Sequence, residues 1–90
     1  MSTHFSRNPK VEMAPMKGET VLFNPANNKF CVLNVTAAFI WDTLERPCTL
    51  DEIASAMASH FGGVDLERAQ REAGLALAQL RGIECVEHQP

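Results

Sequence analysis

Cysteine and histidine are the residues of this sequence best suited to chemistry, because thiolates and imidazoles bind metals and act as nucleophiles or bases. The cysteines are Cys31, Cys48 and Cys85. The histidines are His4, His60 and His88. The cysteines are odd in number and lack the C-x-x-C spacing of a zinc site, and the histidines lie near the termini and at a helix end. We therefore expect three reduced thiols, no metal site and no cofactor, although Cys48 follows Pro47 in a predicted loop where solvent can reach a thiol.

Carboxylates are the other candidates for chemistry, and Asp51 and Glu52 are the one pair suited to acid and base roles. This pair has a structural explanation, because Thr49 followed three residues later by Glu52 is a capping box that begins a helix. The sequence contains no glycine-rich phosphate loop, no H-E-x-x-H motif and no nucleophile elbow. We therefore expect no catalytic residue and no enzymatic activity.

Length and charge limit the classes of protein that fit. The chain has 90 residues, 46% of them hydrophobic and 21% charged, which is typical of one globular domain. Its formal charge of −3, with eight scattered cations, disfavours nucleic acid, whose binding depends mainly on neutralising phosphates. We find no signal-peptide pattern and no run near the roughly 20 apolar residues that a bilayer requires. We expect a cytoplasmic protein with no membrane partner.

Strand patterns occupy the first part of the chain. Residues 1–9 are polar and lack periodicity, so we expect a flexible N-terminal arm. Alternation across residues 10–13 predicts a short strand, and Lys17-Gly18 predicts a turn. Residues 19–23 and 29–33 are rich in β-branched and aromatic residues, and the intervening Asn24-Pro25-Ala26-Asn27-Asn28 predicts the turn of a hairpin.

Three helices follow. Asn34 caps the first, Thr49 begins the second, which runs to about His60, and Asp65 opens the third, which ends at Gly82. The predicted core positions are Ala37, Ile40, Trp41, Leu44, Ile53, Met57, Phe61, Leu66, Ala69, Ala73, Leu77 and Leu80. Gly74 lies in mid-helix, where it is either tolerated or allows another backbone to approach closely. Residues 83–87 form a last short strand or an extended tail.

This order predicts an α+β fold, winged helix-turn-helix-like, with a three-stranded antiparallel sheet followed by three helices. Such a fold raises DNA binding, with the third helix as the reader. That helix carries Arg68 and Arg71 but also Asp65, Glu67 and Glu72. Arg7 and Lys10 can supply a basic arm. A DNA-binding regulator is therefore the alternative function, and the mixed charges disfavour it.

Two predicted surfaces lack a partner. The strand at 29–33 is apolar on both faces, with Phe30 and Val32 on one face and Cys31 and Leu33 on the other. Leu75 points away from the buried stripe of the third helix. Its helical neighbours are Arg68, Arg71, Glu72 and Gln79. Either the N-terminal arm or a helix of the same chain covers the strand, or its edge is open to another chain, in which case a homodimer is one way to cover it.

Several motifs in order carry a family resemblance. They are Val21-Leu22-Phe23-Asn24-Pro25, Leu33-Asn34, Thr36-Ala37-Ala38, Ile40-Trp41, Thr49-Leu50-Asp51-Glu52-Ile53-Ala54, Phe61, and Leu77-x-x-Leu80 before Gly82-Ile83. Over about residues 9–87 the chain resembles the PqqD family. The resemblance implies a precursor-peptide recognition element, a non-catalytic peptide chaperone or adaptor. It would bind the leader of a ribosomally made precursor peptide and present it to a modifying enzyme, often a radical S-adenosylmethionine protein.

The resemblance also implies a binding site, in a single peptide-binding domain over residues 10–87. The leader would add as a strand beside the predicted strand at 29–33 and pack against the third helix. The implied peptide-binding residues are Lys29, Phe30, Cys31, Val32, Leu33, Arg68, Arg71, Glu72, Leu75 and Gln79. Phe30, Val32 and Leu75 would form an apolar pocket, and Arg68 and Arg71 would meet acidic leader side chains. Residues 24–29 differ from the tighter segment usual in members dedicated to pyrroloquinoline quinone synthesis, so the pathway stays open.

Overall fold

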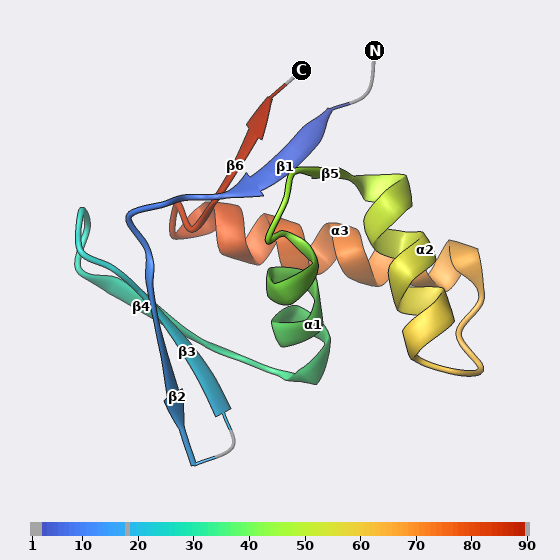
Figure 1. The fold of residues 1–90 in the computed structure, drawn as a ribbon, viewed down its shortest axis with the longest axis horizontal. Coiled ribbons are helices and arrows are strands. Elements are labelled where there is room, and N and C mark those ends of the chain that lie inside the picture. The colour runs from blue at the N-terminus through green and yellow to red at the C-terminus, as the bar shows by residue number, and fades with distance from the viewer. Residues whose placement is uncertain (1–2, 18, 90) are drawn as a thin grey trace.

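Two small antiparallel sheets lie beside three helices in the computed structural model of the chain, which describes residues 3–17 and 19–89 (Figure 1). In chain order the elements are β1 (His4–Arg7), β2 (Glu12–Met16), β3 (Glu19–Asn24), β4 (Lys29–Leu33), α1 (Val35–Thr43), β5 (Cys48–Thr49), α2 (Leu50–His60), α3 (Leu66–Gly82) and β6 (Val86–Gln89). The predicted α+β class is confirmed, and the winged-helix-like description fits it roughly.

The sheet β2-β3-β4 is the three-stranded antiparallel sheet that the sequence predicts. In its register Phe23 lies opposite Phe30, and Leu22 lies opposite Cys31. The connecting turn contains Asn28 at φ 57°, a left-handed conformation that asparagine tolerates. The first strand begins at Glu12, slightly later than the predicted segment. Lys17 lies in a turn as predicted, while Gly18 falls outside the described residues.

The second sheet, β5-β1-β6, corrects the prediction for the N-terminus. The expectation of a flexible arm is wrong for His4–Arg7, which forms the central strand and pairs with both β5 and β6. The partners of β1 lie more than 40 residues away along the chain, so local patterns do not reveal the pairing. The predicted alternative of a last short strand is realised as β6, shifted to Val86–Gln89.

Each helix begins at the cap that the sequence predicts. The Asn34 side chain accepts a hydrogen bond from the Ala37 amide at 2.8 Å. Thr49 and Glu52 form the reciprocal capping box, at 3.2 Å and 2.8 Å. These bonds satisfy amide groups that a helix start otherwise leaves without partners.

The hydrophobic core lies between the helices and the inner faces of the two sheets. Its largest fully buried apolar side chains are Leu22, Ile40, Leu44, Ile53, Met57 and Leu80. Two predictions need correction. Leu66, the first residue of α3, is 50% exposed, because the helix begins at the edge of the core. A Cβ at Gly74 would meet nothing within 4 Å, so no other backbone approaches it closely.

Two polar side chains fasten the sheets to the helices. Arg7 of β1 donates to the Trp41 carbonyl near the end of α1, at 2.9 Å and 2.6 Å, and lies 4.7 Å from the centre of the Trp41 ring. Asn24, fully buried at the end of β3, donates to the carbonyls of Ile83 and Glu84 at 3.0 Å and 3.2 Å. Since a buried amide without partners is costly, this arrangement fixes the hairpin turn against the end of α3.

No described helix has both the length and the apolar character that spanning a membrane requires.

Candidate functional site

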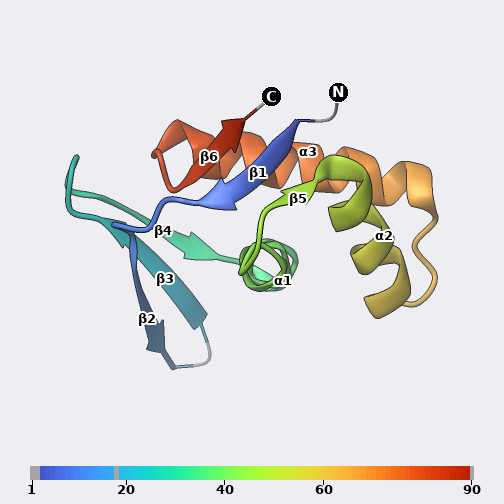
Figure 2. The same cartoon turned by 45° about the horizontal axis from the view of Figure 1, so that its top comes forward.

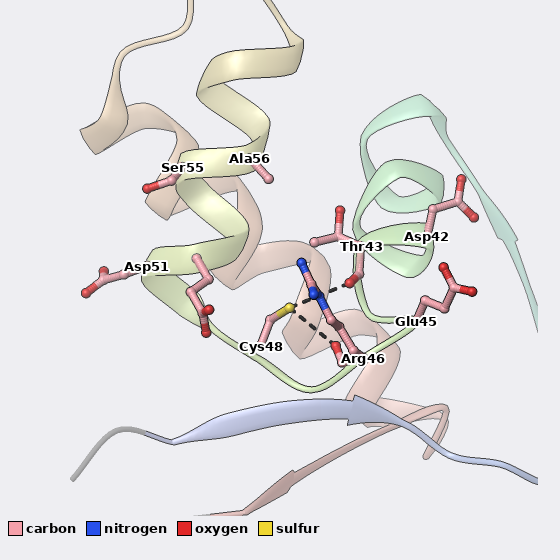
Figure 3. A pocket seen from close by; sticks show the side chains of 9 residues that line it. Asp42, Thr43, Glu45, Arg46, Cys48, Asp51, Ser55 and Ala56 are labelled. Carbon is pink, nitrogen blue, oxygen red and sulfur yellow. Dashed lines mark hydrogen bonds between the residues drawn. The ribbon is translucent and has the colours of Figure 1, made fainter.

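A cavity of about 810 Å³ lies between the end of α1 and the beginning of α2 (Figure 3). The residues that line it are Asp42, Thr43, Glu45, Arg46, Cys48, Asp51, Glu52, Ser55 and Ala56. It contains a thiol and several carboxylates, so it is the first place to look for catalytic chemistry.

The cysteine of this cavity has a structural role. Cys48 is buried, contrary to the expectation that solvent reaches it, because the loop folds against the core. Its thiol donates to the carbonyls of Arg46 at 3.3 Å and Thr43 at 3.6 Å. Burial, and then the nearby Glu52 carboxylate, raise the pKa of Cys48 against an opposing effect of Arg46. The thiol is therefore protonated near neutral pH and a poor nucleophile.

Glu52 is also committed to structure. Hydrogen bonds from the backbone amide and the side chain of Thr49 hold the pKa of Glu52 below its ordinary value. An ionised carboxylate that caps a helix is a weak base, so Glu52 is poorly suited to general acid or base catalysis. Among the residues that the structure describes, no three His, Cys, Asp or Glu side chains are grouped to hold a metal ion.

A second region presents backbone instead of reactive side chains. Strand β4 is the last strand of the order β2-β3-β4, so the edge away from β3 is unpaired within the described chain. Figure 2 shows β4 as the strand of this sheet nearest to α1 and α3. The Gln79 side chain of α3 donates to the Cys31 sulfur at 3.4 Å. Strand β4 therefore contacts α3 at Cys31 and Gln79.

The face of α3 toward β4 carries the residues predicted for the site. Arg68, Glu72, Leu75 and Gln79 are spaced three or four positions apart, which places them on one side of the helix. Leu75 is 68% exposed, large for an apolar side chain. The Nε of Arg68 lies 3.3 Å from a carboxylate oxygen of Glu72 in an exposed ion pair.

A cavity of about 280 Å³ lies between this face of α3 and the beginning of α1. The lining residues are Asn34, Thr36, Ala37, Glu72, Leu75, Ala76 and Gln79. Glu72, Leu75 and Gln79 were predicted for the site, whereas the α1 wall was not. Its position depends on how α1 packs against α3. The sequence signal for α1 was its cap at Asn34, which indicates a helix start but not a neighbour. We call this cavity and the free edge of β4 the β4–α3 groove.

Phe30 and Val32 do not share this cavity with Leu75. They are 68% and 50% exposed and alternate with Cys31, which contacts α3 through Gln79. Successive side chains of a strand point to opposite faces, so Phe30 and Val32 lie on the sheet face turned away from α3. The predicted single pocket of Phe30, Val32 and Leu75 is therefore divided by the strand itself. Arg68 and Arg71 are exposed but do not line the cavity.

The β4–α3 groove thus combines unpaired backbone donors and acceptors with a cavity that has both polar and apolar side chains in its wall. An unpaired strand edge can accept another extended segment through main-chain hydrogen bonds, and an adjoining cavity can receive one of its side chains.

Comparison with known proteins is consistent with this geometry. The fold matches that of a solved structure described as TbiB1 in complex with the TbiA(beta) leader peptide, with a TM-score of 0.79 and 24% sequence identity over 91% of this chain and 94% of that one. It also matches a lasso peptide synthetase B1 complexed with the leader peptide, with a TM-score of 0.72 and 21% identity over 92% and 96% of the two chains. At these identities the likeness concerns the fold.

No curated protein sequence matches the chain. The family model described as coenzyme PQQ synthesis protein D (PqqD) matches residues 19–86. That match begins at β3 and ends at the first residue of β6, so it includes β4, α1 and α3, the elements that form the groove. The protein belongs to the PqqD family.

Proposed function

We propose that this protein is a non-catalytic adaptor that binds the leader segment of a ribosomally made precursor peptide in the β4–α3 groove. The observation that carries the proposal is the free edge of β4, which contacts α3 at Cys31 and leads through Asn34 to a cavity containing the exposed Leu75. Soluble domains usually shield such edges with short strands, charge or a covering element. An edge left open next to a cavity that can receive a side chain is suited to strand addition.

The added strand would use the predicted residues in two ways. The backbone of Lys29–Leu33 would supply main-chain hydrogen bonds. Alternate side chains of the peptide would point toward Leu75 and Gln79 on one side, and beside Phe30 and Val32 on the other. Both sets of predicted residues then contact the same peptide from opposite faces. Arg68 and Arg71 would form ion pairs with acidic side chains of the peptide. Arg68 would give up its present ion pair with Glu72 to do so.

The two solved structures with the same fold hold leader peptides according to their descriptions, which supports the peptide as ligand. Family membership supports a role beside a peptide-modifying enzyme, for which we propose a radical S-adenosylmethionine protein in the cytoplasm. The structural roles of Cys48 and Glu52 support a chain without catalytic activity of its own. A homodimer through the free edge would compete with the peptide for the same hydrogen bonds.

The alternative of a DNA-binding regulator has less support. Arg7, which could belong to a basic arm, donates instead to the Trp41 carbonyl. Arg68 at the start of α3 pairs with Glu72, and Asp65 caps the same turn. A reading helix with these charges is poorly suited to phosphates.

The test uses the leader of a short precursor peptide encoded beside the gene for this chain. On titration, amide NMR shifts should concentrate in β4 and between Arg68 and Gln79. Leu75→Asp should weaken binding by about 1 to 3 kcal/mol, because it replaces the exposed apolar side chain of the cavity with a charge. The matched control is Leu66→Asp, which changes an exposed leucine of the same helix outside the cavity. Unchanged affinity in a folded Leu75→Asp protein would exclude this groove.

A further inference from the structure

A further cavity, of about 690 Å³ and with mostly apolar walls, lies on the side of α1 away from the β4–α3 groove. We call it the second cavity. Its apolar lining consists of Val32, Leu33, Val35, Ala38, Phe39 and Phe61. Val35 is 74% exposed although it lies at the mouth of a hollow lined by apolar side chains. Clefts of this size with mostly apolar walls are typical of binding sites for ligands or side chains.

The far wall of this second cavity is a packed aromatic cluster. The rings of Phe39 and His60 stack with centroids 4.4 Å apart, and Phe39 meets Phe61 edge-to-face at 5.3 Å. These contacts join α1 to the end of α2 and hold the wall in place before any ligand arrives. A preformed wall lowers the entropy cost of binding.

The rim of the second cavity is acidic. Glu19 and Asp42 line it, and none of its described lining residues is lysine or arginine. Asp42 lies 4.0 Å from Arg7, at the limit of an ion pair, whereas Glu19 forms no ion pair within the described residues. The rim therefore favours a ligand that carries positive charge beside its apolar part.

The second cavity continues the β4–α3 groove across one residue. Asn34 lines both cavities. Past it, Thr36 and Ala37 face the groove, while Ala38 and Phe39 face the second cavity. A strand added to β4 that runs beyond Leu33 arrives at Asn34, the exposed cap of α1. Its next residues can cross this cap into the second cavity.

We propose that the second cavity binds a further segment of the same peptide, one with an apolar or aromatic side chain followed by lysine or arginine. This inference rests on the proposed function, because the peptide must first occupy the edge of β4. The apolar side chain would enter between Val35 and the aromatic wall, and the cation would lie near Glu19. The site would give the peptide a second anchor, so recognition extends beyond the strand-paired segment.

A second copy of the chain suits this cavity less well. In a symmetric dimer the same surface meets itself, so each acidic rim would face the partner's acidic rim without lysine or arginine to compensate. A separate protein docking there is the remaining alternative, and it would leave peptide affinity unaffected by changes in the cavity.

The experiment uses a phage-displayed library of random peptides of about 12 residues, which at roughly 3.3 Å per residue exceed the protein's longest dimension of 35 Å. Clones are selected on the wild-type protein and counter-selected on Leu75→Asp, so that survivors depend on the β4–α3 groove. Each synthetic peptide is compared with a shortened version that keeps only its strand-pairing core. Val35→Asp tests the second cavity, and Leu66→Asp is the matched control, since both replace an exposed apolar first residue of a helix.

We expect Val35→Asp to weaken binding of the long peptides by about tenfold, as for loss of an apolar anchor, and to leave the shortened peptides unchanged. Glu19→Lys should remove the enrichment of lysine and arginine among selected clones. Equal affinities of Val35→Asp and Leu66→Asp for the long peptides would overturn the inference while the proposed function stands. Failure to recover any Leu75-dependent clone would overturn both.

Discussion

The two three-stranded sheets of this protein differ in the length and composition of their outer strands. In β5-β1-β6 the outer strands are short, with two residues in β5 and four in β6, and β6 reads Val-Glu-His-Gln. In β2-β3-β4 both outer strands have five residues, and β4 includes the exposed Phe30 and Val32. Short polar edges resist pairing with other chains, and long apolar edges invite it. The first sheet thus pairs the N-terminal strand β1 with the C-terminal strand β6, and the second sheet contains the surface that we propose for the peptide.

The largest effect expected concerns the anchor of the second sheet. Asn24→Ala removes the side-chain hydrogen bonds to the Ile83 and Glu84 carbonyls and from the Ala26 amide. We expect a loss of about 3 kcal/mol in the free energy of unfolding, near 1 kcal/mol for each lost bond. Denaturant unfolding measures it. In the comparison variant Asn27→Ala, a half-buried amide of the same turn loses its bonds to the Ile83 carbonyl, the Glu84 carboxylate and the Lys29 amide. Two of these three bonds are exposed to water, so the loss should be smaller than for Asn24→Ala. Equal losses of unfolding free energy in the two variants would contradict the role of Asn24 as the main anchor of the hairpin turn.

Thiol reactivity sharpens the comparison, because each sheet has its own cysteines. Cys31 lies half-buried on β4, whereas Cys48 in β5 and Cys85 before β6 are buried. Burial, with a smaller effect of Cys31, raises the pKa of Cys85 to about 11. Iodoacetamide should alkylate Cys31 at least about tenfold faster than the other two, because thiolate and access control the rate. Peptide mapping by mass spectrometry follows each site. Faster reaction at Cys48 would mean that the first sheet opens more readily than the second.

The first sheet has its own fastening, and breaking it should matter less. Arg7→Ala removes two hydrogen bonds to the Trp41 carbonyl and the contact with the Trp41 ring. We expect a loss of about 1 to 2 kcal/mol in unfolding free energy and no change in peptide affinity. Arg7→Lys keeps the charge and should recover part of the stability. A fall in peptide affinity would show that the two sheets are coupled.

The smallest expected effect lies where β5 joins α2. The pKa of Glu52 is lowered from its ordinary value of 4.5 by hydrogen bonds from Thr49. A lowered pKa stabilises the fold above the unfolded value, and this contribution disappears as the pH falls through the folded value. Glu52→Gln should therefore be less stable than the wild type at pH 7, and the two should converge in acid. Unfolding curves at several pH values measure this convergence; a difference that persists unchanged in acid would contradict the role of the charge.

The sequence predicts features that a few neighbouring residues determine. Thr49 with Glu52, the cap at Asn34 and the turn beginning at Asn24 are local signals, and each appears in the structure where expected. The pairing of β1 was missed because its partners are distant in sequence. Leu66 fits the helical period of buried positions, but its exposure depends on where α3 leaves the core.

The candidate site was predictable to the same extent. Leu75 was identified because it departs from the buried stripe of its own helix, which is a local pattern. The separation of Phe30 from Leu75 was not identified, because it depends on which face of β4 turns toward α3. The α1 wall, with Thr36 and Ala37, depends likewise on how two helices pack.

The contact between Asn24 and Ile83 also has a consequence for synthesis of the chain. It joins positions 59 residues apart. The hairpin can fold locally, but its docking must wait until α3 and the residue after it have left the ribosome. Strand β4 and helix α3, which form the groove, therefore reach their final relative position late in synthesis. An incomplete chain therefore lacks a finished binding surface, so only full translation through the end of α3 yields a protein able to capture a peptide as proposed.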